Sequence, residues 1–331
     1  MKIMVTGAGG YLGATFVYQA LENGYDVLGI DNFSNSEESS IIKLSSFNKF
    51  TFKNHDLNYD KGALLDVVSR FQPDFVVHFA GLKSVDESEH NPILYWRNNL
   101  TATINLVEVM LKLNLTKLIF SSSATIYGES IIQPIPESAE LKSISPYGST
   151  KIAIEQFLQD VSKANSLDVI SLRYFNPIGS HKKKIIFDSP FNKPANLMPR
   201  LVRVALGLDQ YINIYGSDYD TDDGTCERDF IHVSDLINGH FNAVEYLKTF
   251  RGFDSFNLGT GHSTSVLSLI SSFEKTCNLK LKKKFQNRRA GDIAVCFADP
   301  QKAKKILNWK AERTIADMCR DSWSSVREFI T

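Results

Sequence analysis

The N-terminal stretch constrains the fold most, because a strand, a glycine-rich turn, a helix and a second strand follow one another without interruption. The strands are the apolar stretches 2–6 and 26–30, the turn runs from Gly7 to Gly13, and helical spacing covers 14–23. Glycines at such a turn let the backbone approach a pyrophosphate at the start of the helix. Asp31 ends the second strand, where its carboxylate can bind both hydroxyls of an adenosine ribose. No arginine follows Asp31, so a 2′-phosphate would be repelled, and the pattern predicts NAD rather than NADP.

Further apolar strands alternate with helical segments before the spacing becomes irregular. These strands are expected at 50–54, 74–81, 117–120 and 167–172. The alternation predicts an α/β fold with a Rossmann-type, doubly wound parallel sheet, whose ligands collect at the carboxyl ends of the strands. We expect a NAD-binding domain over 1–176, with returns at about 230–260 that include a strand at 256–259. A smaller, mixed α/β substrate-binding domain is expected over 177–331.

The composition excludes several classes of partner. Lysine plus arginine and aspartate plus glutamate number 37 each, so the charge balance favours neither nucleic acid nor an anionic membrane as a partner. The first residues read as a strand rather than a signal peptide, and no apolar run is long enough to span a bilayer. Metal-ligand spacing is absent among the four cysteines, which are Cys226, Cys277, Cys296 and Cys319. These features predict a cytoplasmic protein without disulfides or a bound metal.

A tyrosine and a lysine stand one helical turn apart in a context that suggests acid–base chemistry. Ser145 before Pro146 is typical of a helix N-terminus, which places Tyr147 and Lys151 on the same face. A nearby ammonium and a helix N-terminus both favour phenolate, so Tyr147 could act as a general base. Ser123, in the serine run after the strand at 117–120, would lie across the ligand crevice from Tyr147. By itself the Tyr–Lys pair is also compatible with a packed aromatic beside a solvated charge.

The segment 98–113 is helical and has two opposed apolar stripes. Leu100, Ile104, Val107 and Leu111 form one stripe, and Leu106, Met110 and Leu113 form the other. One stripe can face the sheet, and the other needs a second partner. A homodimer through this helix and the one that begins near Tyr147 would supply it, and burial under a later segment is the alternative.

Several stretches together resemble one family. They are 5–13, 31–32, 78–83, 121–128, 146–151, 173–179, 196–199, 228–233 and 289–292. The chain resembles the extended short-chain dehydrogenases/reductases, the NAD-dependent epimerases and dehydratases, and within them the enzymes that epimerise UDP-hexoses at C4. The resemblance runs nearly end to end. It implies tightly held NAD and reversible interconversion of UDP-glucose and UDP-galactose through a transient 4-keto sugar.

The resemblance also implies roles for individual residues. Tyr147 would take the proton of the C4 hydroxyl, Lys151 would lower the pKa of Tyr147 and bind the nicotinamide ribose, and Ser123 would hydrogen-bond the sugar oxygen. The implied cofactor residues are Gly7, Gly10, Tyr11, Leu12, Gly13, Asp31, Asn32, Asp56, Leu57, Phe79, Ala80, Lys83, Asn98, Lys151 and Tyr174. The implied substrate residues are Lys83, Ser123, Tyr147, Asn176, Asn196, Leu197, Asn213, Tyr215, Arg228, Arg289, Asp292 and Cys296. Arg228 and Arg289 would neutralise the diphosphate bidentately.

Cys296 and the segment 182–192 depart from the family pattern. Cys296 stands where the family has a tyrosine if only unsubstituted glucose and galactose are accepted. The smaller side chain should admit an acetamido group, which predicts that UDP-GlcNAc and UDP-GalNAc are also interconverted; the alternative is that Cys296 is merely a small buried apolar residue. The basic segment 181–193 is interpreted as a solvated loop in preference to a phosphate contact.

Three other functions remain open at this stage. A nucleotide-sugar 4,6-dehydratase would need an acid–base pair where this chain has Ala124 and Thr125, neither of which is a carboxylic acid. A net oxidoreductase would release NADH and consume cofactor during turnover. A redox sensor would bind the dinucleotide without catalysis, but such proteins usually lose the tyrosine or the lysine, and this chain has both.

Overall fold

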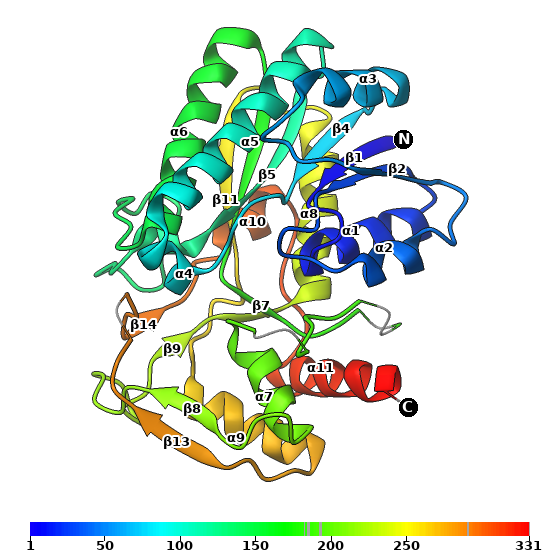
Figure 1. Cartoon of the computed structure of the whole chain (residues 1–331). Coiled ribbons are helices and arrows are strands. Elements are labelled where there is room, and N and C mark those ends of the chain that lie inside the picture. The colour runs from blue at the N-terminus through cyan, green and yellow to red at the C-terminus, as the bar shows by residue number, and fades with distance from the viewer. Residues whose placement is uncertain (182, 184–185, 192–193, 290, 331) are drawn as a thin grey trace. The chain divides into compact units, whose positions relative to one another are not determined.

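The computed structural model describes every residue except 182, 184–185, 192–193, 290 and 331 (Figure 1). The chain forms two compact units. The first comprises Met1–Gly128, Leu141–Arg173 and Gly239–Phe256, and the second comprises Glu129–Glu140, Tyr174–Asn238 and Asn257–Thr331.

The first unit is built on a seven-stranded sheet in the order β11-β6-β5-β4-β1-β2-β3. The strands are β1 (Lys2–Thr6), β2 (Asp26–Asp31), β3 (Phe50–Asn54), β4 (Phe75–His78), β5 (Lys117–Ser123), β6 (Asp168–Tyr174) and β11 (Phe253–Leu258). β1 pairs in parallel with both β2 and β4. The chain order therefore reverses between β1 and β4, and in such sheets ligands bind outside the carboxyl ends of the strands at this reversal. The doubly wound parallel sheet predicted from the sequence is confirmed.

Helices cover the sheet on both faces (Figure 1). They are α1 (Tyr11–Glu22), α2 (Glu38–Leu44), α3 (Lys61–Phe71), α4 (Val85–His90), α5 (Pro92–Lys112), α6 (Pro146–Asn165) and α8 (Val233–Leu247), with the 3-10 helix η1 (Ala124–Tyr127). The core between sheet and helices includes Met4, Leu28, Leu106, Met110 and Phe120, none more than 1% exposed.

Helix α5 differs from the sequence prediction at its start. It begins at Pro92, six residues before the expected position, with the proline in its first turn. Proline is favoured there because its missing N–H would have no partner inside the helix. Of the two apolar stripes, Leu106 and Met110 are fully buried, whereas Ile104 is 37% exposed. The stripe of Leu100 and Ile104 is thus the one that the first unit leaves partly uncovered.

The second unit contains short strands and four helices among the described residues. The strands are β7 (Asn176–Ile178), β8 (Ile212–Tyr215), β9 (Glu227–Arg228), β10 (Phe230–His232), β12 (Thr264–Ser265), β13 (Lys283–Gln286) and β14 (Val295–Cys296). The helices are α7 (Leu197–Ala205), α9 (Val266–Cys277), α10 (Gln301–Ile306) and α11 (Ile315–Ile330). Its core includes Leu201, Ile214, Leu269, Ile270 and Phe273, each at most 1% exposed.

The start of α8 corrects a prediction. The sequence suggested a cap at Ser234 or Asp235, but the helix begins at Val233. Asp235 lies inside it, and its carboxylate accepts hydrogen bonds from the backbone N–H groups of Glu312 (3.0 Å) and Arg313 (2.9 Å) and pairs with the Arg313 guanidinium. The carboxylate satisfies backbone donors that lie far away in sequence, a role that local spacing does not reveal.

In the part of the chain that the structure describes, no helix combines the length and apolarity needed to cross a membrane.

Candidate active site

The glycine turn of the first unit leaves room for a phosphate at the start of α1. Gly7 has a φ of +70°, and a Cβ atom there would lie 2.7 Å from the backbone N of Ala80. A Cβ on Gly13 would lie 2.0 Å from the carbonyl oxygen of Gly7. Gly10, the N-cap of α1, has no side chain that could cover the helix N-terminus. A bare helix N-terminus favours an anion, and this cradle fits the pyrophosphate of a dinucleotide.

Asp31 at the end of β2 is tied to the same turn. Its Oδ2 accepts a hydrogen bond from the backbone N–H of Gly9 (2.8 Å), and its Oδ1 accepts from the backbone N–H of Phe33 and the hydroxyl of Ser36 (2.8 Å each). The carboxylate is 8% exposed. This arrangement holds an anionic acceptor beside the glycine turn, as a ribose with two free hydroxyls requires.

The other predicted cofactor residues of the first unit flank the carboxyl ends of β3 and β4. Burial raises the pKa of the Asp56 carboxyl. Hydrogen bonds from Asn58 and Asn32 lower this pKa by more, so that it lies below its usual value. Phe79 and Ala80 follow β4 directly, and the backbone N–H of Phe79 donates to the carbonyl oxygen of Thr6 (3.1 Å). Leu57 is buried, Asn98 lies on α5, and the exposed Lys83 precedes α4. Tyr11 and Leu12 are the first two residues of α1.

One predicted cofactor residue lies elsewhere. Tyr174, the last residue of β6, belongs to the second unit, whereas the rest of the predicted cofactor set lies in the first unit.

The three predicted catalytic residues are brought together in the first unit. Ser145 caps α6 by accepting the backbone N–H of Gly148 (3.2 Å), which places Tyr147 in the first turn, as predicted. The Ser123 hydroxyl lies near the Tyr147 phenol, where a hydrogen bond from it would lower the pKa of the phenol. Ser123 Oγ also accepts from the backbone N–H (3.3 Å) and the hydroxyl (3.0 Å) of Thr125. The bonds from Thr125 leave the Ser123 proton available to point at Tyr147.

A glycine allows this close approach of α6 to η1. A Cβ on Gly148 would lie 2.1 Å from the Ser143 hydroxyl and 2.8 Å from the carbonyl oxygen of Thr125. The helix can therefore pack against the turn that carries Ser123 only because position 148 has no side chain.

Lys151 is held by a strand of the sheet and lies near the ring of Tyr147. Its Nζ donates to the carbonyl oxygen of Ser121 (2.8 Å) and lies 4.7 Å from the centre of the Phe120 ring and 5.8 Å from that of the Tyr147 ring. Burial raises the pKa of Tyr147 to about 12, and the hydrogen bond from Ser123 opposes that rise. Burial thus opposes the phenolate form of Tyr147 that the sequence predicted.

Burial also acts on Lys151 itself. It lowers the pKa of the Lys151 amine to about 8, and the negative charge of Glu155 works against this decrease. Tyr147 and Lys151 are both less than 9% exposed. The site therefore holds a neutral phenol and an amine that titrates close to physiological pH.

In the second unit, two predicted arginines share one carboxylate. Arg228 Nη2 lies 3.5 Å from Asp292 Oδ1, and Arg289 Nε lies 3.0 Å from Asp292 Oδ2. The Arg289 guanidinium also lies 4.7 Å above the ring of Tyr215. Cys296 on β14 stands opposite Arg228 on β9 in the strand register. Burial raises the pKa of the Cys296 thiol to about 11, so the thiol is neutral.

The remaining predicted substrate residues belong to three further elements of this unit. Asn213 lies on β8 with Tyr215, and its Oδ1 accepts from the side-chain amide of Gln286 (3.3 Å). Asn196 precedes Leu197 at the start of α7, and its Nδ2 donates to Asp188 Oδ2 (3.1 Å). Asn176 begins β7 and is exposed.

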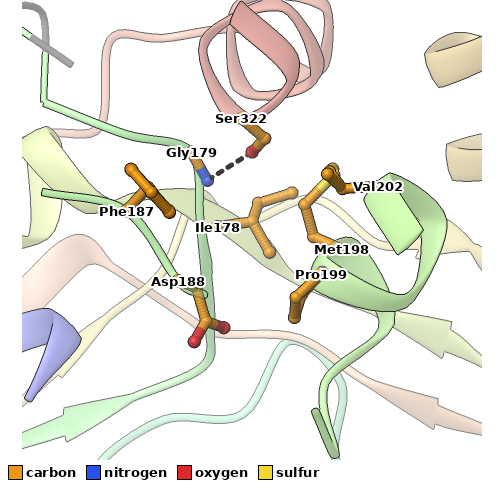
Figure 2. A pocket seen from close by; sticks show the side chains of 8 residues that line it. All are labelled: Ile178, Gly179, Phe187, Asp188, Met198, Pro199, Val202 and Ser322. Atoms are coloured by element: carbon orange, nitrogen blue, oxygen red, sulfur yellow. Dashed lines mark hydrogen bonds between the residues drawn. The ribbon is translucent and has the colours of Figure 1, made fainter. Parts of the chain in front are cut away.

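A small cavity lies beside the start of α7 (Figure 2). Its volume is about 10 Å³, enough for roughly one water molecule. It is lined by Ile178, Gly179, Phe187, Asp188, Met198, Pro199, Val202 and Ser322, and the Ser322 hydroxyl accepts from the backbone N–H of Gly179 (3.1 Å). The cavity is too small for a nucleotide, and none of its lining residues was predicted as a site residue.

Sequence reasoning missed one polar group close to the arginines. It assigned 218–223 to a hydrated turn, but Tyr219 in this segment is 5% exposed, and its hydroxyl has no hydrogen-bond partner among the described residues. Asp292 and Arg228 both influence its pKa, which burial raises. The Arg288 guanidinium lies 4.2 Å above its ring. An unpartnered buried hydroxyl marks a position where a ligand atom would be stabilised.

The doubly wound sheet, the phosphate cradle and the Ser–Tyr–Lys group together define a dinucleotide-dependent enzyme of the short-chain dehydrogenase/reductase type. Residues 3–259 match the model of the "NAD dependent epimerase/dehydratase family". The chain belongs to this family, and its cofactor is NAD. The family and the cofactor predicted from the sequence are therefore confirmed.

Particular relatives span the whole chain. It is 44% identical over 326 residues to a UDP-glucose 4-epimerase of Bacillus subtilis, covering 98% of this chain and 96% of the relative. Among solved structures, the UDP-glucose 4-epimerase of Bifidobacterium longum in complex with NAD+ and UDP has a TM-score of 0.95 and 40% identity, covering 99% and 98% of the two chains. The UDP-Glc/GlcNAc 4-epimerase of Campylobacter jejuni has a TM-score of 0.85 and 33% identity, covering 99% of each.

Proposed function

We propose that this protein interconverts UDP-glucose and UDP-galactose by NAD-dependent epimerisation at C4 of the hexose. The observation that carries the proposal is the grouping of Ser123, Tyr147 and Lys151 in the unit that holds the phosphate cradle. Two relatives that align with almost the whole chain, at 44% and 40% identity, are both named UDP-glucose 4-epimerase. Their names support the choice of substrate.

The proposed chemistry begins with a proton transfer at Tyr147. Bound NAD supplies a hydride acceptor that later returns the hydride, and in its oxidised form it adds a positive charge to the site. That charge and the Lys151 ammonium both favour the phenolate, against the burial that raises the pKa of Tyr147 to about 12. As phenolate, Tyr147 accepts the proton of the C4 hydroxyl, and the Ser123 hydroxyl donates a hydrogen bond to the same sugar oxygen.

Loss of this proton together with the hydride on C4, which bound NAD would accept, leaves a 4-keto sugar that stays bound through its nucleotide. Rotation about the diphosphate linkage presents its other face, and Tyr147 returns the proton as the C4 hydroxyl forms again with inverted configuration. Lys151, held by the carbonyl oxygen of Ser121 at 2.8 Å, keeps its ammonium near the phenol during both transfers. The reaction consumes no NAD, which distinguishes it from a net oxidation.

We assign NAD to the first unit and the UDP group to the second. Arg228 and Arg289 would exchange part of their pairing with Asp292 for the diphosphate, which offers more acceptors and a larger negative charge. Asn176, Asn196, Leu197, Asn213 and Tyr215 would contact the uridine and the sugar. Lys83 and Tyr174 would complete the contacts to cofactor and substrate.

The size of Cys296 favours a wider substrate range. Its neutral thiol occupies a position next to Arg228 in the strand register, close to where the diphosphate would lie. A cysteine there leaves space that a tyrosine would fill, and we therefore extend the proposal to UDP-GlcNAc and UDP-GalNAc. The structural similarity to an enzyme named as a UDP-Glc/GlcNAc 4-epimerase supports this extension.

The proposal also includes a homodimer. The stripe of Leu100 and Ile104 on α5 is partly exposed, and the same helix exposes Ile93 (75%) and Trp96 (40%) near its start. Pairing two copies along α5 and α6 would cover this apolar surface. Analytical ultracentrifugation of Ile104→Lys should give monomers where the wild type gives dimers; equal masses for both proteins contradict the pairing.

The decisive experiment is an assay of the four UDP-sugars without added NAD, together with Tyr147→Phe. The wild type should interconvert UDP-glucose and UDP-galactose while its co-purified NAD is neither consumed nor released. Tyr147→Phe should retain NAD and lose at least about 10²-fold in kcat, because the proton acceptor is missing. Tyr59→Phe, which changes a 70% exposed tyrosine, serves as the control and should keep full activity. Full activity of Tyr147→Phe, or NADH released in step with turnover, refutes the proposal.

A further inference from the structure

A buried ion pair lies directly behind the Ser–Tyr–Lys group. Arg173 on β6 donates to Glu155 on α6 from Nε to Oε1 (3.1 Å) and from Nη2 to Oε2 (2.7 Å). The two side chains are 5% and 4% exposed. The Ser171 hydroxyl donates to Glu155 Oε1 (2.8 Å), and Arg173 Nη1 donates to the hydroxyl of Tyr127 (2.9 Å).

This cluster joins the three elements that carry the site. Glu155 stands one turn beyond Lys151 on α6, and Tyr127 ends the 3-10 helix η1 that begins directly after Ser123. Arg173 is the last residue of β6 within the first unit. Its guanidinium lies 5.3 Å above the ring of Tyr127. One side chain, Arg173, thus connects the element that presents Ser123 with the helix that presents Lys151.

Net stability does not explain why two charges are buried here. Removing such a pair from water costs several kcal/mol per ion, and its attraction often only offsets that cost. An apolar pair of the same size would hold the three elements together about as well. What an apolar pair cannot supply is directional bonding to Tyr127 and a fixed negative charge near Lys151.

The charged and polar groups around Lys151 make that negative charge significant. They are Tyr147 and Glu155 on the same helix, the carbonyl oxygen of Ser121 on β5, the buried His78 on β4 and Arg173 on β6. Burial lowers the pKa of Lys151, and Glu155 opposes that decrease. Glu155 therefore favours the ammonium form of Lys151 although this side chain is buried.

We propose that the Glu155–Arg173 pair is a positioning device of the active site, which fixes η1 against α6 and keeps the amine of Lys151 protonated at neutral pH. Neither residue touches the reacting atoms; Glu155 acts through Lys151, and Arg173 acts through Tyr127 and Glu155. The inference rests on the proposed function only for the role of Lys151 in turnover.

The test is the titration of Lys151 in two variants and one control. Glu155→Gln removes the negative charge and leaves Arg173 charged, so Lys151 should titrate about one pH unit lower than in the wild type. Glu155→Gln/Arg173→Met removes both charges, and Lys151 should titrate between the other two. Glu108→Gln on α5 breaks an exposed ion pair with Lys61 of α3 and should match the wild type. The ¹³Cε resonance of Lys151 in the NAD-loaded protein, assigned with Lys151→Arg, reports the titration without substrate.

The pH dependence of kcat supplies a second readout. In Glu155→Gln, activity should start to fall about one pH unit lower on the alkaline side, with kcat reduced more than KM is raised. A purely structural role would lower the thermal stability and leave both pH midpoints unchanged.

Identical Lys151 titrations in the wild type and both variants overturn the proposal. If Glu155→Gln does not fold, the double variant decides, because it removes both charges of the pair: a Lys151 midpoint equal to that of the wild type overturns the proposal. If the wild type epimerises no UDP-sugar, the proposed function fails, but the titration still tests the electrostatic role.

Discussion

His78 at the end of β4 should make the stability of this protein unusually sensitive to acid. The ring is 1% exposed and lies between two hydroxyls, with Nδ1 2.7 Å from Thr6 Oγ1 and Nε2 3.0 Å from Thr103 Oγ1. The Thr103 hydroxyl donates to the carbonyl oxygen of Asn99 (2.9 Å), so Nε2 must be the donor toward Thr103. Nδ1 then accepts from Thr6, and a second ring proton could bond to Thr6 only if that hydroxyl turned its own proton away.

The magnitude follows from the pKa of this ring. Burial, assisted by the positive charge of Lys151, lowers the pKa of His78 to about 3 from an ordinary value of about 6.5. Below pH ~6.5 the unfolded chain binds a proton that the folded protein excludes, so folding stability is complete above that pH and decreases as the pH falls toward 3. The slope is about 1.4 kcal/mol per pH unit, or about 3 kcal/mol between pH 6 and pH 4.

The assay compares the wild type with His78→Gln, whose neutral amide can bond to both hydroxyls. Urea unfolding, followed by far-UV circular dichroism from pH 7 to pH 4, gives the free energy of unfolding of each protein. The wild type should lose about 3 kcal/mol more than the variant between pH 6 and pH 4, because all other groups titrate in both. His90→Gln, which changes an exposed histidine on α4, should behave as the wild type. Parallel pH curves for the wild type and His78→Gln would refute this account of the buried ring.

Three further substitutions test the geometry of the site. Gly13→Ala should yield protein without bound NAD, measured by absorbance after denaturation, since the new Cβ would lie 2.0 Å from the carbonyl oxygen of Gly7; normal NAD content would contradict the cradle. Gly148→Ala should lower kcat at least tenfold while NAD content stays near that of the wild type, because its Cβ would lie 2.8 Å from the carbonyl oxygen of Thr125; unchanged kcat would show that close packing of α6 on η1 is dispensable. Cys296→Tyr should abolish turnover of UDP-GlcNAc and preserve that of UDP-glucose, measured in the same coupled assay; equal loss on both sugars would contradict a role in substrate size.

The elements that the sequence predicted well are those governed by local chemistry. A serine before a proline indicated the start of α6, and the structure has Ser145 capping the backbone N–H of Gly148. Glycines indicated the phosphate cradle because only they permit its close contacts. Pro92 is the same kind of signal for α5, because a proline favours the first turn of a helix and α5 begins at this residue.

The features that the sequence did not predict depend on partners far apart in the chain. Lys151 is held by the carbonyl oxygen of Ser121, 30 residues away, and burial of the whole group decides the pKa of Tyr147. Asp235 satisfies Glu312 and Arg313, 77 and 78 residues away, instead of capping α8. Spacing along a helix shows which side chains share a face, but it does not show how far folding removes that face from water.

The position of β11 at the edge of the sheet affects how the chain folds as it is synthesised. β6 ends at Tyr174, yet the strand that borders it begins only at Phe253. Phe241, which stacks on Phe16 of α1 at 4.8 Å between ring centres, is also translated late. A nascent chain that emerges from the ribosome therefore carries an unpaired strand edge and an uncovered aromatic ring until both segments have left the exit tunnel. This interval is when a chaperone would be needed most, and a premature stop before Phe241 should produce an insoluble fragment.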